Sequence, residues 1–171
     1  MIEDFEQLYN KHAKQVYNLV LHYVQNTQDA EEITQDVFVS AYEQLQQFRS
    51  ESAIGTWIYR IAINKSLDFL KAKKRKKRFA LFSLFTPENE PRHFEHPGVL
   101  MEHEEETKQL FGYINNLPDN QKTALILQKI DGKSIAEIGI IMDLGTKAVE
   151  SLVQRAKTNL LKKLNEAKDG K

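Results

Sequence analysis

The sequence contains no cysteine, and this absence excludes a disulfide framework and any metal site built from thiolates. It has no uninterrupted apolar run that approaches the roughly 20 residues needed to span a bilayer, so we expect no membrane insertion. The first ten residues, MIEDFEQLYN, lack the basic start and apolar run of a signal peptide. We therefore expect a cytoplasmic protein.

Three signatures of common enzyme classes are also missing: a glycine-rich phosphate loop, the G-x-S-x-G elbow and H-E-x-x-H. A metal cluster of His93, His96, His103 and Glu104 remains conceivable on residue type alone. However, the first two histidines stand in a proline-broken stretch that does not fix ligand geometry. We therefore expect no enzymatic activity, no metal site and no cofactor.

The net charge is zero, with 24 basic and 24 acidic side chains, which on its face argues against a nucleic-acid binder. The balance is a sum over unlike segments. Residues 1–79 carry 12 basic and 10 acidic side chains, residues 80–118 carry 2 and 7, and residues 119–171 carry 10 and 7. Two mildly basic ends therefore flank an acidic middle.

Hydrophobic spacing predicts an all-α fold. Apolar side chains recur at three- and four-residue steps over residues 5–23 and again over 33–45, and a third helix is expected from about Thr56 to Lys74. The break between the first two helices, QNTQDAEE, offers Asn26, Thr27 or Asp29 as an N-cap. No alternating strand pattern competes with these helices.

Three of the four prolines fall between residues 79 and 98, where the helical period is lost, and this stretch is typical of a linker. Helix is expected to resume near Leu100, and a further helix with Pro118 in its first turn is expected to run to about Ile130. We therefore predict two small helical domains, residues 1–78 and 106–171, joined by a flexible linker at 79–105.

The segment DGKSIAEIGIIMDLGTKAVESLVQRAKTNLLKKL has the spacing of a helix-turn-helix. Ser134 is a good N-cap with Glu137 at the capping-box position, a short turn falls at Leu144 and Gly145, and another helix starts near Thr146. Such a pair is typical of DNA-binding proteins, although short helical hairpins are common for purely structural reasons. Nearby cations favour DNA: they are Lys147, Arg155, Lys157, Lys162 and Lys163.

Residues 48–78, FRSESAIGTWIYRIAINKSLDFLKAKKRKKR, combine the only tryptophan with an almost unbroken basic run. Each feature has a structural alternative. Trp57 stands at helical spacing with Ile58 and Ile61, which is typical of a core residue. The basic run lies at the end of a predicted helix, where the helix dipole favours cations without any ligand.

Together these segments resemble a sigma-70-family RNA polymerase sigma factor of the minimal, extracytoplasmic-function (ECF) type, which has only sigma regions 2 and 4. DAEEITQDVFVSAYEQL resembles the family's core-polymerase-binding helix, and the segment around Trp57 resembles its promoter-melting and −10-reading part. LPDNQKTALILQKIDGKSIAEIGIIMDLGTKAVESLVQRAKTNL resembles its −35-reading domain. The similarity covers nearly everything but the linker.

By matching position, the resemblance implies a role for four groups of residues. Core polymerase would be bound by Asp29, Glu32, Gln35 and Asp36, unless these form only a polar, well-capped helix face. Unstacked −10 DNA would be held by Arg49, Ser50, Glu51, Ser52, Trp57, Arg60 and Asn64. DNA phosphates would be bound by Lys65, Lys71, Lys73 and Lys74. The −35 duplex would be read by Lys147, Glu150, Ser151, Gln154, Arg155 and Lys157.

The start of the predicted recognition helix departs from the family's usual Ser, Thr and basic residues. This chain has Gly145, Ala148, Glu150 and Leu152 there, so no −35 sequence is assigned. The partners that the resemblance implies are core RNA polymerase, promoter DNA and an anti-sigma factor. Two alternatives remain: a stand-alone helix-turn-helix regulator, and a nucleic-acid-processing enzyme that would need a carboxylate or metal cluster.

Overall fold

A computed structural model describes residues 4–83 and 103–170, and within these ranges every regular element is helical. The prediction of an all-α fold is confirmed. The first helical domain contains α1 (Phe5–Val24), α2 (Thr27–Gln44), a 3-10 turn η1 (Leu45–Gln47) and α3 (Ile54–Ser83). The second helical domain contains α4 (His103–Asn115), α5 (Asp119–Leu125), a π-helical turn η2 (Ile126–Ile130), α6 (Ile135–Met142) and α7 (Thr146–Asp169).

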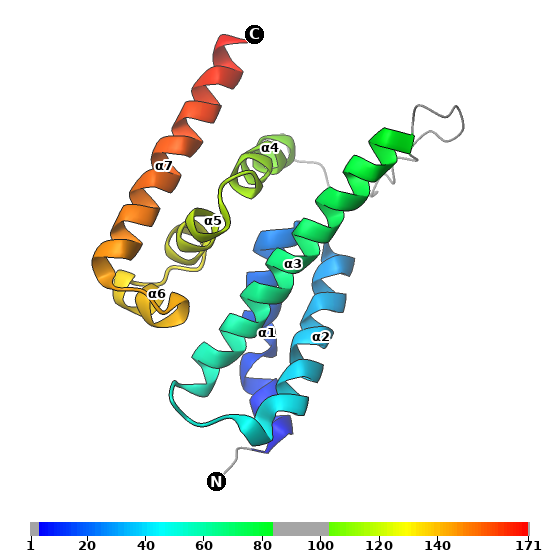
Figure 1. Ribbon diagram of the computed structural model, residues 1–171, viewed down its shortest axis with the longest axis vertical. Helices are drawn as coiled ribbons and strands as arrows, with labels where there is room; N and C mark the ends of the chain where they lie inside the picture. Colours follow the sequence, from blue (N-terminus) through cyan, green and yellow to red (C-terminus); the bar gives the residue numbers. More distant parts are fainter. Residues whose placement is uncertain (1–3, 84–102, 171) are drawn as a thin grey trace.

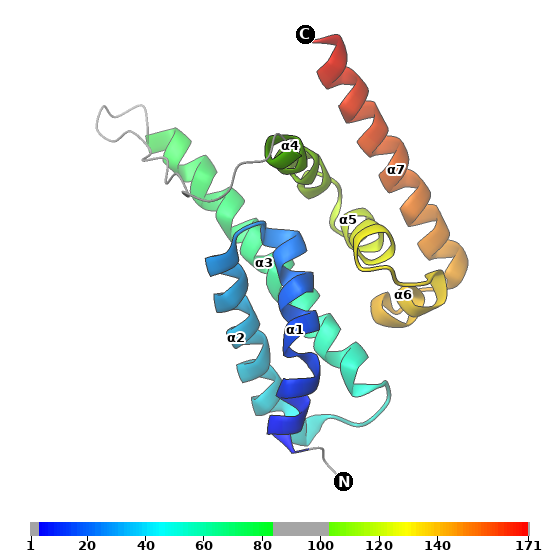
Figure 2. The same ribbon diagram turned by 180° about the vertical axis from the view of Figure 1, so that it is seen from behind.

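Helices α1, α2 and α3 pack side by side, and α5, α6 and α7 form a second group with α4 lying along α7 (Figures 1 and 2). Apolar side chains spaced about one turn apart on each of α1, α2 and α3 supply the first domain's buried face, because three- and four-residue steps return to the same side of a helix. No helix of the described ranges is both long and apolar enough to cross a membrane.

The junction of α1 and α2 is capped as the sequence predicts. Gln25 ends α1 in the left-handed region at a φ of 53°, and Asn26 is the N-cap of α2. The Asn26 side chain accepts a hydrogen bond from the Asp29 backbone N–H at 2.9 Å. This bond satisfies one of the amide groups that the first helical turn leaves unpaired.

We expect Asn26→Ala to lower the free energy of unfolding by about 1 kcal/mol, because the cap bond is lost. Equilibrium urea denaturation measures the change. Asn18→Ala is the matched control, since Asn18 lies exposed inside α1 and alanine is the better helix former there. Equal destabilisation by the two variants would contradict the capping role of Asn26.

Helix α3 is longer than the sequence pattern predicts, ending at Ser83 rather than near Lys74. The added residues, RKKRFALFS, contain neither glycine nor proline, and the first proline beyond them is Pro87. Lysine, arginine, alanine and leucine are good helix formers. Local propensity therefore extends the helix after its apolar stripe has ended.

The helix-turn-helix is formed by α6 and α7. The predicted capping box is confirmed: Ser134 N–H donates to Glu137 Oε2 at 2.7 Å, and Glu137 N–H donates to Ser134 Oγ at 3.2 Å. The bond from the Ser134 N–H favours the charged carboxylate and lowers the pKa of Glu137. Asp143, at a φ of 55°, ends α6, and three residues later α7 begins. Pro118 is the N-cap of α5 and so lies one position before the helix rather than inside its first turn.

Candidate nucleic-acid interface

The loop before α3 exposes most of its polar side chains. Arg49, Ser50 and Glu51 are exposed and Ser52 is half-buried. Ser50 has a φ of 56°, in the left-handed region that non-glycine residues seldom adopt. A strained, exposed loop of hydrogen-bonding residues is a frequent feature of ligand-binding sites. We call residues 49–52 the α3 loop.

Trp57 lies where the α3 loop meets the core. Its ring centroid is 5.0 Å from that of Phe48, with the planes tilted by 38°. The indole is half-buried and packs against the hydrophobic cluster. Trp57 therefore packs partly as a core residue beside the α3 loop. The rest of its indole surface is exposed to solvent.

Arg60 and Asn64 lie one turn apart on α3, and both face the second helical domain. The Arg60 guanidinium donates to two backbone carbonyls at the C-terminal end of α6: Nη2 to Ile140 O at 2.6 Å and Nε to Ile141 O at 2.9 Å. Asn64 lines a groove of about 370 Å³ that Asp143 also borders. The structure thus places these two predicted DNA-binding residues on the same face of α3. Arg60 is partly covered by α6, and Asn64 borders a groove.

A larger groove of about 710 Å³ separates the α3 loop from the turn of the helix-turn-helix. Glu51, Ser52 and Arg60 line one wall, and Gly145 and Thr146 line the other. The two predicted DNA-reading elements therefore face each other across this groove.

Three of the four predicted phosphate-binding lysines contact groups of the protein itself. Lys71 Nζ lies 3.1 Å from Asp119 Oδ2, and Lys74 Nζ donates to the Asn115 carbonyl at 3.1 Å. Lys73 Nζ lies 3.5 Å from Asp29 Oδ2 within the first domain. Lys65 is half-buried on α3. Lys71 and Lys74 thus bind the second helical domain, while Lys73 pairs with a predicted polymerase contact.

The predicted −35-reading residues occupy one side of α7. Val149, Val153 and Ala156 are buried against the rest of the second domain. With 3.6 residues per turn, Lys147, Ser151 and Gln154 fall on the opposite side of the helix. The exposed members of the predicted set are Lys147, Glu150, Ser151, Gln154 and Arg155, and Lys157 is half-buried.

The exposed side of α2 carries Glu32, Gln35 and Asp36, as the sequence predicts. The same side also bears two large apolar residues that sequence reasoning missed. Val39 is 56% exposed and Tyr42 is 64% exposed. Their exposure could have been predicted from the sequence, because both residues lie outside the buried stripe of α2 and continue the three- and four-residue spacing from Gln35 and Asp36. A polar face with apolar members suits a protein partner better than solvent.

Buried ionisable groups gather where the two domains meet. The Tyr59 hydroxyl donates to Asp131 Oδ2 at 3.2 Å, and burial together with this carboxylate raises the pKa of Tyr59. Burial lowers the pKa of His22, and the charge of Asp131 partly opposes that shift. Burial lowers the pKa of Lys122, and the nearby positive charge of Lys74 lowers it further. These polar groups lie within the contact between the two domains.

No group of three or more possible metal ligands occurs within residues 4–83 and 103–170. His93 and His96, with residues 84–102 of the linker predicted at 79–105, lie outside the described residues, while residues 79–83 and 103–105 are helical rather than part of a linker.

Two family descriptions match this chain: "Sigma-70 region 2" over residues 8–76 and "Sigma-70, region 4" over residues 108–160. The chain is 33% identical over 158 residues to the ECF RNA polymerase sigma-E factor of Escherichia coli K12, covering 90% of this chain and 82% of that protein. It is 30% identical over 165 residues to the RNA polymerase sigma-H factor of Pseudomonas aeruginosa, covering 94% and 86%.

Two solved structures share the fold at lower identity. One is CnrH in complex with the cytosolic domain of CnrY, with a TM-score of 0.64, 22% identity and coverage of 95% of this chain and 88% of that chain. The other is the sigma factor RpoE in complex with the anti-sigma factor NepR from Bartonella quintana, with a TM-score of 0.62, 21% identity and coverage of 96% and 98%.

Proposed function

The chain belongs to the sigma-70 family, as an RNA polymerase sigma factor of the ECF type, and we therefore propose that it binds core RNA polymerase and directs initiation at specific promoters. The observation that supports the proposal is the presence, in one chain, of two separate surfaces that carry hydrogen-bonding and basic side chains suited to DNA. One is the α3 loop with the adjoining face of α3, and the other is the exposed side of α7. The polymerase performs the chemistry, so the protein itself needs no catalytic group.

In this proposal residues 1–78 melt and read the −10 element. Unstacking a base costs about a few kcal/mol, which the protein offsets by holding the flipped base and its strand. Arg49, Ser50, Glu51 and Ser52 would bind the base, and Trp57, Arg60 and Asn64 would hold the strand. The lysines of α3 would bind phosphates, which gives affinity that falls with salt but little sequence preference.

Residues 106–171 would read the −35 element as duplex DNA. The exposed side of α7 would enter the major groove, where Lys147, Ser151, Gln154 and Arg155 can donate to base edges or phosphates. Glu150 can accept from the amino group of cytosine, and Lys157 adds a positive charge. A stand-alone helix-turn-helix regulator would use this surface alone and would leave the α3 loop and α2 without a role.

Core polymerase would contact the exposed side of α2. Its carboxylates and amide suit a basic, polar partner surface, and electrostatic complementarity of this kind speeds and orients association. Asp29, Glu32, Gln35 and Asp36 supply the polar contacts, and we add Val39 and Tyr42 as the apolar part of the face. We further propose regulation by an anti-sigma factor, because one fold neighbour forms such a complex. The proposal locates the protein in the cytoplasm, where core polymerase works.

Reconstituted transcription tests this function. Purified protein with sigma-free core polymerase from its own source should initiate at a small set of sites in a genomic promoter library, and those sites should share two spaced motifs. Core polymerase alone should not initiate there. Failure of the protein to co-migrate with core or to support initiation would overturn the proposal.

A variant of the α2 face adds a sharper prediction. Gln35→Ala with Asp36→Ala should weaken core binding at least about tenfold, since interface contacts of this type each contribute about 1 kcal/mol. Asn165→Ala with Glu166→Ala is the matched control, because it removes an exposed amide and carboxylate from the far end of α7. Binding to labelled core polymerase is the measurement. Equal affinities for the two variants would remove α2 from the interface.

A further inference from the structure

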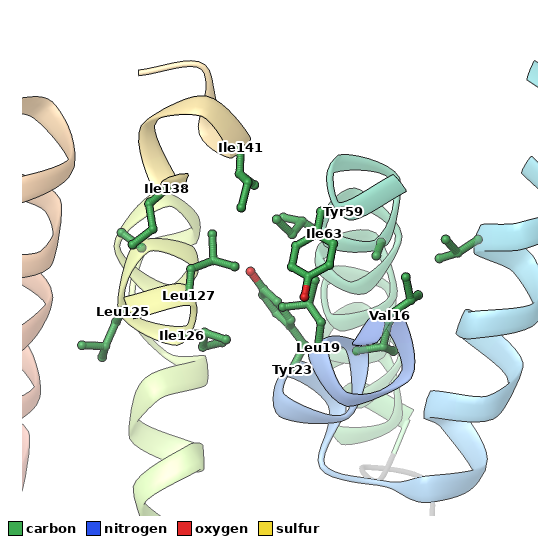
Figure 3. Packing of buried hydrophobic residues seen from close by; sticks show 14 of the residues in the cluster. Val16, Leu19, Tyr23, Tyr59, Ile63, Leu125, Ile126, Leu127, Ile138 and Ile141 are labelled. Carbon is green, nitrogen blue, oxygen red and sulfur yellow. The ribbon is translucent and has the colours of Figure 1, made fainter. Parts of the chain in front are cut away.

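The C-terminal part of α3 projects beyond the other helices of the first domain (Figures 1 and 2). Earlier in α3, Tyr59 and Ile63 are buried among apolar side chains of neighbouring helices (Figure 3). Residues 75–81, in contrast, are all exposed. Seven consecutive residues form nearly two turns of a helix, so no side of this stretch is covered by another described part of the chain. We call residues 75–81 the α3 overhang.

The α3 overhang begins with four consecutive cations, which are Arg75, Lys76, Lys77 and Arg78. No acidic side chain occurs anywhere from residue 69 to residue 83. Like charges four positions apart on a helix, such as Lys74 and Arg78, destabilise it by about 0.2–0.5 kcal/mol per pair. Nothing within this part of α3 compensates the repulsion, and a bound polyanion would relieve it.

The helix dipole does not account for the cations of the overhang. The dipole favours cations in the last turn of a helix, where the backbone carbonyls are unpaired. Helix α3 continues to Ser83, and its last turn carries no basic residue. The structural explanation that the sequence offers for the basic run therefore does not apply to these side chains.

The cations of the overhang also differ in their contacts from the lysines that precede them. Lys71, Lys73 and Lys74 each lie close to an oxygen atom of the protein. The side chains of residues 75–78 make no ion pair or hydrogen bond with any described residue. Their guanidinium and ammonium groups are therefore available to a partner, and a basic stretch along one helix is the electrostatic footprint of a nucleic-acid-binding surface.

We infer that the α3 overhang binds phosphates of the double-stranded DNA between the −10 and −35 elements; this inference rests on the proposed function. The chain continues from α3 to the domain proposed to read the −35 element, which lies upstream. Arg78 is about 14 residues beyond Asn64, or about 21 Å along an α-helix. At about 3.4 Å per base pair, the overhang reaches at most about six base pairs upstream of the strand that Asn64 holds.

A helix with cations on all sides fits the major groove of this duplex. The groove is about 12 Å wide, and an α-helix with its side chains is about 10–12 Å across. The phosphates of both strands then flank the helix. Arg75 and Lys77 lie on nearly opposite sides of α3, so each can meet the phosphates of a different strand. Continuous basic helices bind DNA in this way, and phosphate contacts supply affinity without sequence preference.

The distribution of charge favours DNA over a membrane surface. A helix that lies on a bilayer has an apolar face along its length, opposite a basic face. In the overhang the cations occupy every side of the first turn, and the exposed Phe79 and Leu81 follow them. Phe79 lines an open groove of about 460 Å³ together with Arg75, Lys76 and Ala80. An apolar ring beside a guanidinium matches the deoxyribose and phosphate that alternate along a DNA strand.

The test compares two variants of the intact protein in complex with core polymerase. Arg75→Ala with Arg78→Ala removes two cations from the overhang, and alanine keeps the helix intact. Lys14→Ala with Lys168→Ala is the matched control, because it removes the same charge from exposed positions of α1 and α7. The DNA is a promoter found by reconstituted transcription, with its −10 element held open by mismatches. Its affinity for each complex is titrated over a range of salt concentrations.

The overhang variant should bind this promoter more weakly and with a smaller salt dependence. Each lost phosphate contact reduces the slope of log affinity against log salt by about 0.9, so two lost contacts reduce it by about 2. At about 0.1 M salt the affinity should fall about tenfold or more. The control variant should behave as the unsubstituted protein does. Equal slopes and affinities for the two variants would overturn the inference.

A shortened promoter locates the contact. This second DNA ends at the upstream edge of the −10 element, so it has no duplex between the two elements. The overhang variant should bind it as tightly as the control variant does, because the phosphates in question are gone. A defect of the same size on both DNAs would place the overhang cations at the −10 element itself, and the inference would then be wrong.

Other outcomes distinguish a membrane partner and failure of the proposed function. Suppose that the unsubstituted protein binds vesicles of phosphatidylcholine and phosphatidylglycerol, that the overhang variant does not, and that their promoter affinities are equal. The overhang would then belong to a membrane contact instead of DNA. Initiation by both variants with equal promoter affinities would refute the duplex contact and keep the sigma function. If even the unsubstituted protein never supports initiation, the sigma function fails, and the duplex contact fails with it.

Discussion

Arg60→Ala with Asn64→Ala is expected to abolish most promoter-specific initiation while core binding is retained. Each lost contact to a base or strand costs about 1–3 kcal/mol. Two lost contacts of about 1.4 kcal/mol each reduce initiation about a hundredfold. The measurement is transcript yield from the reconstituted system at limiting promoter, with co-migration of the variant and core polymerase measured in parallel.

Arg60→Ala also removes two hydrogen bonds to α6. Arg60→Lys keeps the charge but loses the planar fork of donors, and should be intermediate. Yields within twofold of the unsubstituted protein would show that neither Arg60 nor Asn64 contacts promoter DNA.

Gly139→Ala is expected to destabilise the second helical domain by about 1–3 kcal/mol, because overpacking a close backbone contact forces the chain to shift. A Cβ at Gly139 would lie 2.8 Å from the Leu144 carbonyl oxygen, in the turn between α6 and α7. The Leu144 N–H donates to the Gly139 carbonyl at 2.9 Å, so the turn cannot move away without losing this bond. The angle between α6 and α7, and with it binding of −35 duplex, should change together with stability.

Gly112→Ala is the matched control, since Gly112 is an exposed residue of α4 and a Cβ there would meet no atom within 4 Å. That substitution should stabilise the protein by about 0.5–1 kcal/mol, because alanine is the better helix former. Chemical denaturation and duplex-binding titrations measure both variants. Similar stability and duplex affinity for the two would show that close approach at Gly139 has no role in the helix-turn-helix.

Most of the helical framework could be predicted from local patterns. Asn26 and Ser134 were recognisable as caps because capping depends on residues three positions apart. The end of α3 was not, because the apolar stripe stops before helix propensity does. The π-helical turn at Ile126–Ile130, where the Asp131 N–H donates to the Ile126 carbonyl five residues back, follows no sequence pattern that we recognise.

Some features of the candidate site likewise follow from local spacing, and others do not. The exposure of most of the predicted −35-reading residues of α7 follows from the spacing of the buried Val149 and Val153. Gly139 was missed, because a close backbone approach across a turn is invisible without coordinates. Val39 and Tyr42 were not predicted as part of the α2 face, because the other exposed residues of that face are polar or charged.

The amino-acid sequence by itself determined the helices, the two halves and the family, since these depend on periodicity, caps and motifs read over a few turns. Only the tertiary structure decided what Arg60, Tyr23 and Lys71 contact in the free protein. Their partners lie in the other domain; Tyr23 and Thr123, for example, are 100 positions apart. Spacing along a chain carries no information about such contacts, because the packing of two completed domains against each other depends on the shape and chemistry of both faces.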